Sequence, residues 1–187
     1  MNDAFQIAVF ASGTGTTLQT LIDSQDSYGY RVALVVVNRE CMAADRAAKS
    51  NIPTLQSIDW EAINDSLRAH DIKLIVLAGF LAIIPHWICE KWEGKIINIH
   101  PSLLPKHGGK GMYGIRVQEA VLAAGDKEAG CTVHYVRAEV DGGRIIAQSI
   151  VGVESNDTPE SLAQRVQQAE KQLLPQIVGI LKAGSYS

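Results

Sequence analysis

Lys95-Ile96-Ile97-Asn98-Ile99-His100-Pro101 carries the most information about the architecture of this chain. Its isoleucines form an apolar run that is typical of a strand buried in a parallel sheet. Proline lacks a backbone N–H, so Pro101 predicts the end of the strand. Side chains alternate along a strand, so Asn98 and His100 should project to one side. An amide and an imidazole are therefore expected together at the carboxyl end of a strand, where open parallel sheets bind ligands.

That pair of side chains suits chemistry at a carbonyl carbon. An amide can donate to an oxyanion, and an imidazole titrates near neutral pH. Four other histidines compete for the role. His70 and His86 are expected to face solvent, and His107 lies on a flexible loop beside two glycines. His134 sits in a predicted strand and is either a hydrogen-bonded core residue or a functional one. Only His100 combines a strand end with a polar neighbour on the same face.

Strand-like and helix-like segments alternate along the chain, which predicts an α/β fold. We expect an open, mostly parallel, Rossmann-like sheet flanked by helices, with an antiparallel strand addition near the C-terminus. The predicted strands are Gln6–Ala11, Val32–Val37, Ile52–Leu55, Ile72–Ala78, Lys95–His100, Cys131–Val136 and Arg144–Val153. The predicted helices are Thr17–Ser24, Glu40–Ser50, Trp60–Ala69, His86–Trp92, Val117–Ala124 and a last one that begins at Pro159 and kinks or restarts at Pro175.

The chain is expected to form one domain. Its 187 residues can bury a sufficient core, and no repeat, low-complexity tract or linker interrupts them. We expect a single domain over residues 1–187, with a phosphate-binding half at about 1–95 and a catalytic half at about 96–187.

The composition indicates a protein that acts on small molecules. The formal net charge of −3 lacks the basic footprint of nucleic-acid binding. Cys41, Cys89 and Cys131 are widely spaced and predict buried reduced thiols rather than a zinc or redox motif. Met1–Ala4 shows no secretory signal, and no apolar run approaches the roughly 20 residues of a membrane helix. We therefore expect a cytoplasmic protein with no metal and neither a nucleic-acid nor a membrane partner.

The first predicted strand runs into Ser12-Gly13-Thr14-Gly15-Thr16-Thr17. Glycines let the backbone approach an anion, and the N-terminus of the next helix offers unpaired N–H groups and a favourable dipole. The loop therefore predicts binding of a phosphate monoester, with an ordinary tight turn as the alternative. It is not a dinucleotide fingerprint, because Leu18 stands where the third glycine belongs, and it lacks the ending of a P-loop.

Asp141 precedes two glycines in the turn that joins the last two predicted strands. Aspartate is common in turns for structural reasons alone. The functional alternative requires Asp141 to fold back near His100, where a carboxylate would favour the charged imidazolium.

At Asn98-Ile99-His100-Pro101-Ser102-Leu103-Leu104-Pro105, taken with Asp141-Gly142-Gly143, the chain resembles the folate-dependent formyltransferases. The resemblance covers nearly the whole chain. It implies transfer of the formyl group of 10-formyltetrahydrofolate to the amine of phosphoribosylglycinamide, a step of de novo purine synthesis, in a monomer or homodimer. The C-terminal half would then also hold the folate.

The resemblance also implies roles for individual residues. The expected catalytic residues are Asn98, His100 and Asp141. The residues expected to hold phosphoribosylglycinamide are Gly15, Thr16, Thr17, Gln167 and Glu170. The residues expected to bind 10-formyltetrahydrofolate are Leu81, Ala82, Ile83, Ile84, Asn98, Arg137, Val140 and Asp141.

The chain departs from the family pattern in four places. Leu81-Ala82 stands where many members have Met-Arg, and Thr17 replaces a common asparagine. The segment 56–70 is shorter than the corresponding segment of some members, in which an arginine helps to hold the folate tail. Residues 106–114 differ from the commoner Pro-Gly-x-His loop.

Three other functions compete with formyl transfer to the nucleotide. A formyltetrahydrofolate hydrolase uses water as the acceptor and carries an N-terminal regulatory domain, for which we expect no room here. A methionyl-tRNA formyltransferase adds a basic RNA-binding domain, which an acidic chain of 187 residues does not accommodate. The third alternative is a nicotinamide dehydrogenase, against which the missing third glycine argues, or a non-catalytic nucleotide-binding module, which predicts nucleotide binding without turnover of any formyl donor.

Overall fold

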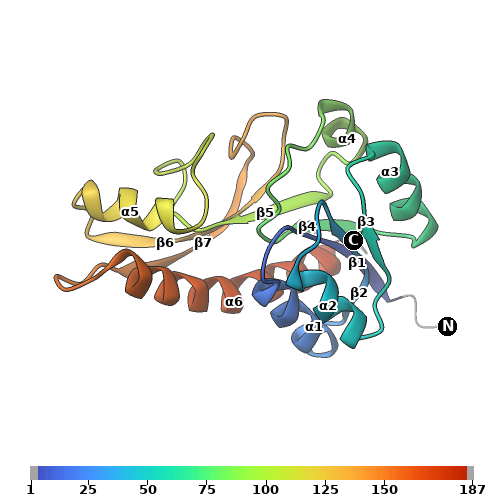
Figure 1. The fold of residues 1–187 in the computed structure, drawn as a ribbon, viewed down its shortest axis with the longest axis horizontal. Helices are drawn as coiled ribbons and strands as arrows, with labels where there is room; N and C mark the ends of the chain where they lie inside the picture. Colours follow the sequence, from blue (N-terminus) through green and yellow to red (C-terminus); the bar gives the residue numbers. More distant parts are fainter. Residues whose placement is uncertain (1–3, 185–187) are drawn as a thin grey trace.

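The protein is built on one seven-stranded sheet, seen in a computed structural model that describes residues 4–184 (Figure 1). The strand order is β3-β2-β1-β4-β5-β6-β7. The first five strands pair in parallel, whereas β6 and β7 are antiparallel additions. The strands are β1 (Phe5–Ala11), β2 (Tyr30–Val37), β3 (Thr54–Gln56), β4 (Leu74–Leu77), β5 (Ile96–His100), β6 (Glu128–Tyr135) and β7 (Ile145–Gly152). The fold class expected from the sequence is confirmed.

Helices cover both faces of the sheet (Figure 1). The long helix α6 packs against α1 and α5 as well as β6 and β7. Helices α3 and α4 bury Ile63 and Ile88 in a second core on the opposite face. The helices are α1 (Thr16–Tyr28), α2 (Met42–Lys49), α3 (Trp60–Ala69), α4 (His86–Lys91), α5 (Ile115–Ala123) and α6 (Pro159–Gly184).

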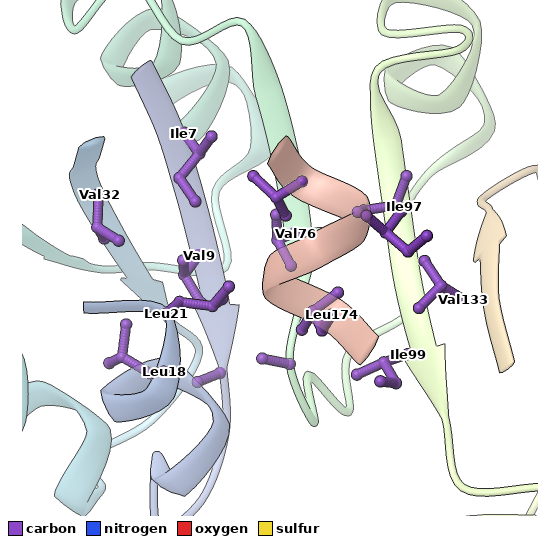
Figure 2. Close-up of a cluster of buried hydrophobic side chains, with 14 of the residues drawn as sticks. Ile7, Val9, Leu18, Leu21, Val32, Val76, Ile97, Ile99, Val133 and Leu174 are labelled. Atoms are coloured by element: carbon purple, nitrogen blue, oxygen red, sulfur yellow. The ribbon is translucent and has the colours of Figure 1, made fainter. Parts of the chain in front are cut away.

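The two cores explain the direction of the β5 side chains. Ile97 and Ile99 enter the core that also contains Leu174 of α6 (Figure 2), whereas Ile96 enters the second core. Successive side chains of β5 therefore point to opposite faces, as the strand geometry requires. Asn98 and His100 thus share one face at the carboxyl end of the strand.

Two helices differ from the sequence prediction. Helix α1 continues past Ser24 to Tyr28, where a left-handed residue, Gly29 (φ 70°), ends the helix and donates its N–H to the Gln25 carbonyl. Of the two alternatives at Pro175, a restart is wrong, because α6 is one continuous helix through the proline. Leu174 and Ile177 are buried on either side of the proline, and this packing keeps the helix going despite the lost backbone donor.

Other expectations concern the cysteines and membrane segments. All three cysteines are free thiols; Cys89 and Cys131 are buried as expected, whereas Cys41 is only half-buried. Within residues 4–184, no helix combines the length and apolar character needed to cross a membrane.

Candidate active site

A cavity of about 600 Å³ opens at the carboxyl ends of β1, β4 and β5. The strand order reverses between the neighbouring strands β1 and β4, and open parallel sheets bind ligands at such a point. Residues 109–114, the segment 134–141 and one face of α6 complete its wall. Every residue that the sequence predicted for catalysis or substrate binding lines this one cavity.

Asn98 faces His134 across the β5–β6 pair, where the two residues are direct partners in the register. The Asn98 Nδ2 atom lies 3.1 Å from His134 Nε2. The register of β6 against β7 shifts between Val133 and His134, and such irregularities change the direction of a side chain beside a site. From the sequence, His134 was either a hydrogen-bonded core residue or a functional residue. The structure places it at this site, where it lines the cavity.

The hydrogen bonds of His134 set its own protonation and the orientation of Asn98. His134 Nδ1 lies 3.0 Å from the Tyr135 carbonyl, which can only accept, so Nδ1 carries a proton. Burial lowers the pKa of His134, against smaller opposing effects of Tyr135 and Asp141. The ring is therefore neutral near pH 7, and its Nε2 accepts a hydrogen bond from the NH2 group of Asn98.

Asp141 lies between two imidazoles. Its Oδ2 atom is 3.6 Å from His100 Nδ1, and its Oδ1 atom is 3.6 Å from His134 Nε2. The side chains of His100 and Asp141 are 5% and 11% exposed, so water screens their charges little. Asp141 therefore lies near His100, as the functional interpretation of this turn residue requires.

The Asp-Gly-Gly turn is also a structural necessity. Asp141 has a left-handed backbone (φ 55°), which aspartate tolerates better than most residues. A Cβ atom on Gly143 would lie 1.6 Å from the Tyr135 carbonyl oxygen, so only glycine fits there. The turn-former and functional interpretations of Asp141 are therefore compatible.

The loop after β1 is held by a buried serine that sequence reasoning did not single out. Ser12 Oγ donates to Asn38 Oδ1 (2.7 Å) and accepts from the Leu81 N–H (2.9 Å). It therefore ties the ends of β1 and β2 to the segment that follows β4. Gly15 is left-handed (φ 70°) as the N-cap of α1, and a Cβ there would lie 2.7 Å from Ala43 Cα.

Helix α6 brings the two remaining predicted substrate residues to this loop. Gln167 Nε2 lies 3.4 Å from Thr16 Oγ1. One turn further along α6, burial in the cavity wall raises the pKa of Glu170 to about 7, against a smaller opposing effect of Lys171. The cavity therefore holds a carboxyl group that changes charge near neutral pH.

Glu170 should make stability depend on pH. Its pKa is raised from 4.5 to about 7 on folding, so its contribution to stability is lost as the pH rises through that window. We expect the Glu170→Gln variant to gain free energy of unfolding relative to the wild type as the pH rises from 4.5 to 7. The gain should be on the order of 1–3 kcal/mol. Urea unfolding at several pH values measures it, with exposed Glu160→Gln as the matched control on α6. A constant difference across this range would contradict the assignment.

Two further segments of the cavity lining are those predicted to bind the folate. Leu81 and Ile83 are 48% and 71% exposed, whereas Ile84 is buried. Arg137 and Val140 are exposed on the segment that leads to Asp141. This side of the cavity is therefore open and largely apolar at its rim.

Gln118 is a further cavity residue that the sequence did not reveal. It is 1% exposed, and its Nε2 donates to the Pro101 carbonyl at 2.8 Å. Among the residues described, its Oε1 atom has no hydrogen-bond partner. From the sequence alone, Gln118 was only one polar position within a predicted helix.

Metal ligation has no support from side-chain clusters. Across residues 4–184, no group of three or more His, Cys, Asp and Glu side chains is placed to hold a metal ion.

Comparison with known proteins identifies the family. A family model described as "Formyl transferase" matches residues 5–178. The chain belongs to the formyl transferase family. Among formyl transferases of known structure, phosphoribosylglycinamide formyltransferase from Anaplasma phagocytophilum is 38% identical, with a TM-score of 0.89 over 96% of this chain and 87% of that chain. The resemblance recognised in the sequence is confirmed.

Sequence relatives within the formyl transferase family are longer. Phosphoribosylglycinamide formyltransferase of Arabidopsis thaliana, a chloroplastic protein by name, is 39% identical; the match covers 94% of this chain and 65% of the relative. The trifunctional purine biosynthetic protein of Chironomus tentans is 38% identical, and the match covers 96% of this chain and 14% of that protein. The chain therefore spans less than two thirds of these relatives.

The same architecture occurs in a family member with another name. A formyltetrahydrofolate deformylase from Pseudomonas syringae is 25% identical, with a TM-score of 0.82 over 96% of this chain and 61% of that chain. The fold therefore does not by itself separate transfer of the formyl group from its hydrolysis.

Proposed function

We propose that this chain transfers the formyl group of 10-formyltetrahydrofolate to the amine of phosphoribosylglycinamide, in de novo purine synthesis. The observation that carries the proposal is the convergence of Asn98, His100 and Asp141 on the cavity whose far end is the loop before α1. Two relatives named phosphoribosylglycinamide formyltransferase are 39% and 38% identical to the chain over the aligned residues. Formyl transferases use a formyl-folate as co-substrate, and the 10-formyl form is the specific part of the proposal.

The proposed reaction is a direct attack. The neutral amine bonds to the formyl carbon, and the carbonyl oxygen becomes an oxyanion. Asn98 donates an N–H to this oxygen, and protonated His100 stabilises it through Nδ1. The intermediate then collapses with cleavage of the bond to the folate nitrogen. The amine loses one proton and the leaving nitrogen gains one, by a relay through water that Asp141 and His100 border.

Asp141 would act by keeping His100 charged. At 3.6 Å, its carboxylate is close enough to favour the imidazolium but does not occupy Nδ1 with a short hydrogen bond. The His100 Nδ1–H therefore remains available to a substrate oxygen. Positioning both substrates in one cavity supplies further acceleration.

The nucleotide would lie along α1 and α6. Backbone N–H groups at the start of α1 suit a phosphate, with hydroxyls from Thr16 and Thr17. Gln167 adds an amide beside Thr16. Glu170 would accept hydrogen bonds from polar groups of the nucleotide. Gly15 keeps the backbone turned toward the anion.

The folate would lie against the opposite wall. We assign the backbone contacts of the pterin to Leu81–Ile84, where the Leu81 N–H itself is already bonded to Ser12. Arg137 and Val140 would close the other side. The arginine that many members carry after residue 81 is absent, so the folate tail must be held differently here.

The same proposal covers the organisation of the chain. One domain would span residues 1–187, with phosphate binding at about 1–95 and folate binding and catalysis at about 96–187; residues 1–3 and 185–187 lie outside the described part. The monomeric or homodimeric state, the absence of nucleic-acid and membrane partners, and the cytoplasmic location stay predictions.

Product analysis tests the proposed function. Purified protein is incubated with 10-formyltetrahydrofolate, with and without phosphoribosylglycinamide. We expect tetrahydrofolate to form only with the nucleotide and in equal amount to the formylated product. Equal folate consumption without the nucleotide would indicate the hydrolase, and nicotinamide dinucleotide binding without formyl transfer would indicate a dehydrogenase-type module.

A further inference from the structure

One short segment contacts both His100 and Asp141 through its backbone. His100 Nε2 lies 2.9 Å from the His107 carbonyl oxygen, and the Gly109 N–H donates to Asp141 Oδ2 at 2.9 Å. We call residues 107–109 the backbone cradle. His107 was set aside as a catalytic candidate because it lies on a loop, yet its backbone carbonyl is an immediate partner of His100.

The cradle has an unusual backbone conformation. His107 has a φ of 53°, in the left-handed region that side-chain-bearing residues rarely adopt, and Gly109 has a φ of 96°. A Cβ atom on Gly108 would lie 2.5 Å from a Leu104 methyl carbon, so the cradle is also closely packed. Such a conformation persists only where the surroundings hold it.

Asp126 provides the side-chain anchor. Its Oδ2 atom lies 2.8 Å from His107 Nε2, and its Oδ1 atom lies 3.0 Å from Lys106 Nζ. The Asp126 and His107 side chains are 17% and 15% exposed, whereas Lys106 is 67% exposed. The hydrogen bond from His107, followed by that from Lys106, lowers the pKa of Asp126. Asp126 lies outside the lining of the cavity and so does not face the substrates.

We propose that Asp126 is a positioning residue that acts through His107 to fix the proton arrangement of the His100 ring. A carbonyl oxygen can only accept, so the His107 carbonyl keeps a proton on His100 Nε2 in both charge states of the ring. The nitrogen that remains for contact with other groups is then Nδ1, which faces Asp141. The consequence for turnover rests on the proposed function, whereas the arrangement of the ring does not.

Losing the anchor should release this arrangement. Without Asp126, the left-handed conformation of His107 loses its side-chain support and the carbonyl moves from His100 Nε2. The neutral ring would then populate both tautomers. Ser102 Oγ still donates to the Lys106 carbonyl at 2.6 Å, so the start of the loop remains attached, whereas its contact with the His107 carbonyl is long at 3.5 Å and holds that carbonyl only weakly. The defect should therefore concern the His100 ring rather than the fold.

The test combines ring spectroscopy with kinetics. Nitrogen-15 NMR of the histidine rings, without substrates, reports which nitrogen of His100 carries the proton. In Asp126→Ala we expect the Nδ1–H tautomer to appear and kcat to fall by about 10- to 100-fold, with KM for both substrates nearly unchanged. His107→Leu removes the other half of the pair and should give the same two results, which keeps the test informative if one variant fails to fold. Lys106→Met removes only the exposed partner and should leave kcat within about twofold.

The outcomes separate this proposal from the function itself. Wild-type spectra and kcat in both Asp126→Ala and His107→Leu would overturn the positioning role. A wild-type protein that shows the Nε2–H tautomer but no formyl transfer would contradict the proposed function and leave the ring arrangement standing. An unchanged tautomer with a lowered kcat would also overturn the proposal, since Asp126 would then act by another route.

Discussion

Asp141→Asn is expected to lower kcat by about 100-fold or more while leaving the binding of phosphoribosylglycinamide nearly intact. Loss of a positioned acid–base group commonly costs about 10²- to 10⁴-fold. The amide lacks the negative charge that, in the proposed mechanism, acts on His100 from 3.6 Å away. Its side-chain oxygen can still accept the hydrogen bond from the Gly109 N–H, so the turn should keep its place. The measurement is steady-state kinetics with both substrates, together with direct binding of the nucleotide.

A matched control separates this charge from others nearby. Glu139→Gln removes a carboxylate from the same turn, where the Glu139 side chain is exposed, and should keep kcat within a few-fold. If Asp141→Asn retained wild-type turnover, the role assigned to Asp141 would be wrong. If both variants lost turnover equally, the effect would belong to the charge of the turn as a whole.

Asn98→Ala is expected to lower kcat by about 100- to 1,000-fold, the usual effect of deleting one oxyanion donor. The amide is held in one orientation because the neutral His134 ring can only accept at Nε2, 3.1 Å away. Alanine removes this donor from the cavity without adding volume. The effect should appear in single-turnover rates at saturating substrates, which report the chemical step rather than product release.

His134→Gln offers a control for the orientation of Asn98. A glutamine side-chain oxygen could accept from the Asn98 amide in place of Nε2, so this variant should lose less turnover than Asn98→Ala. Equal single-turnover rates for Asn98→Ala and the wild type would contradict the oxyanion role. A loss confined to KM would instead indicate that Asn98 contributes ground-state binding.

The sequence predicted those parts of the fold that depend on local signals. Asp59 stands directly before α3, aspartate is a preferred N-cap residue, and its carboxylate accepts from the Glu61 and Ala62 N–H groups. The apolar runs that became β2 and β5 needed no tertiary information either. The continuation of α6 through Pro175 did need it, because the packing of neighbouring side chains outweighs a local helix breaker.

The same division applies to the site. Asn98 and His100 are two residues apart on one strand, so alternation alone placed them together. The approach of Asp141 required the sheet to fold, and only the motif resemblance pointed to it. Ser12 and Gln118 were missed because each acts through partners that are distant in sequence. The contact of His107 with His100 is made by a backbone carbonyl, which no residue type reveals.

The central claim is that Asp141 acts through His100, and a double-mutant cycle on kcat tests it most directly. The single variants His100→Ala and Asp141→Asn are compared with the protein that carries both substitutions. If the carboxylate works only by keeping the imidazole charged, the double variant should be no slower than His100→Ala, because residues that act as one unit do not lose activity additively. A double variant that loses the product of the two single losses would show that the two groups act independently, and the account would be contradicted.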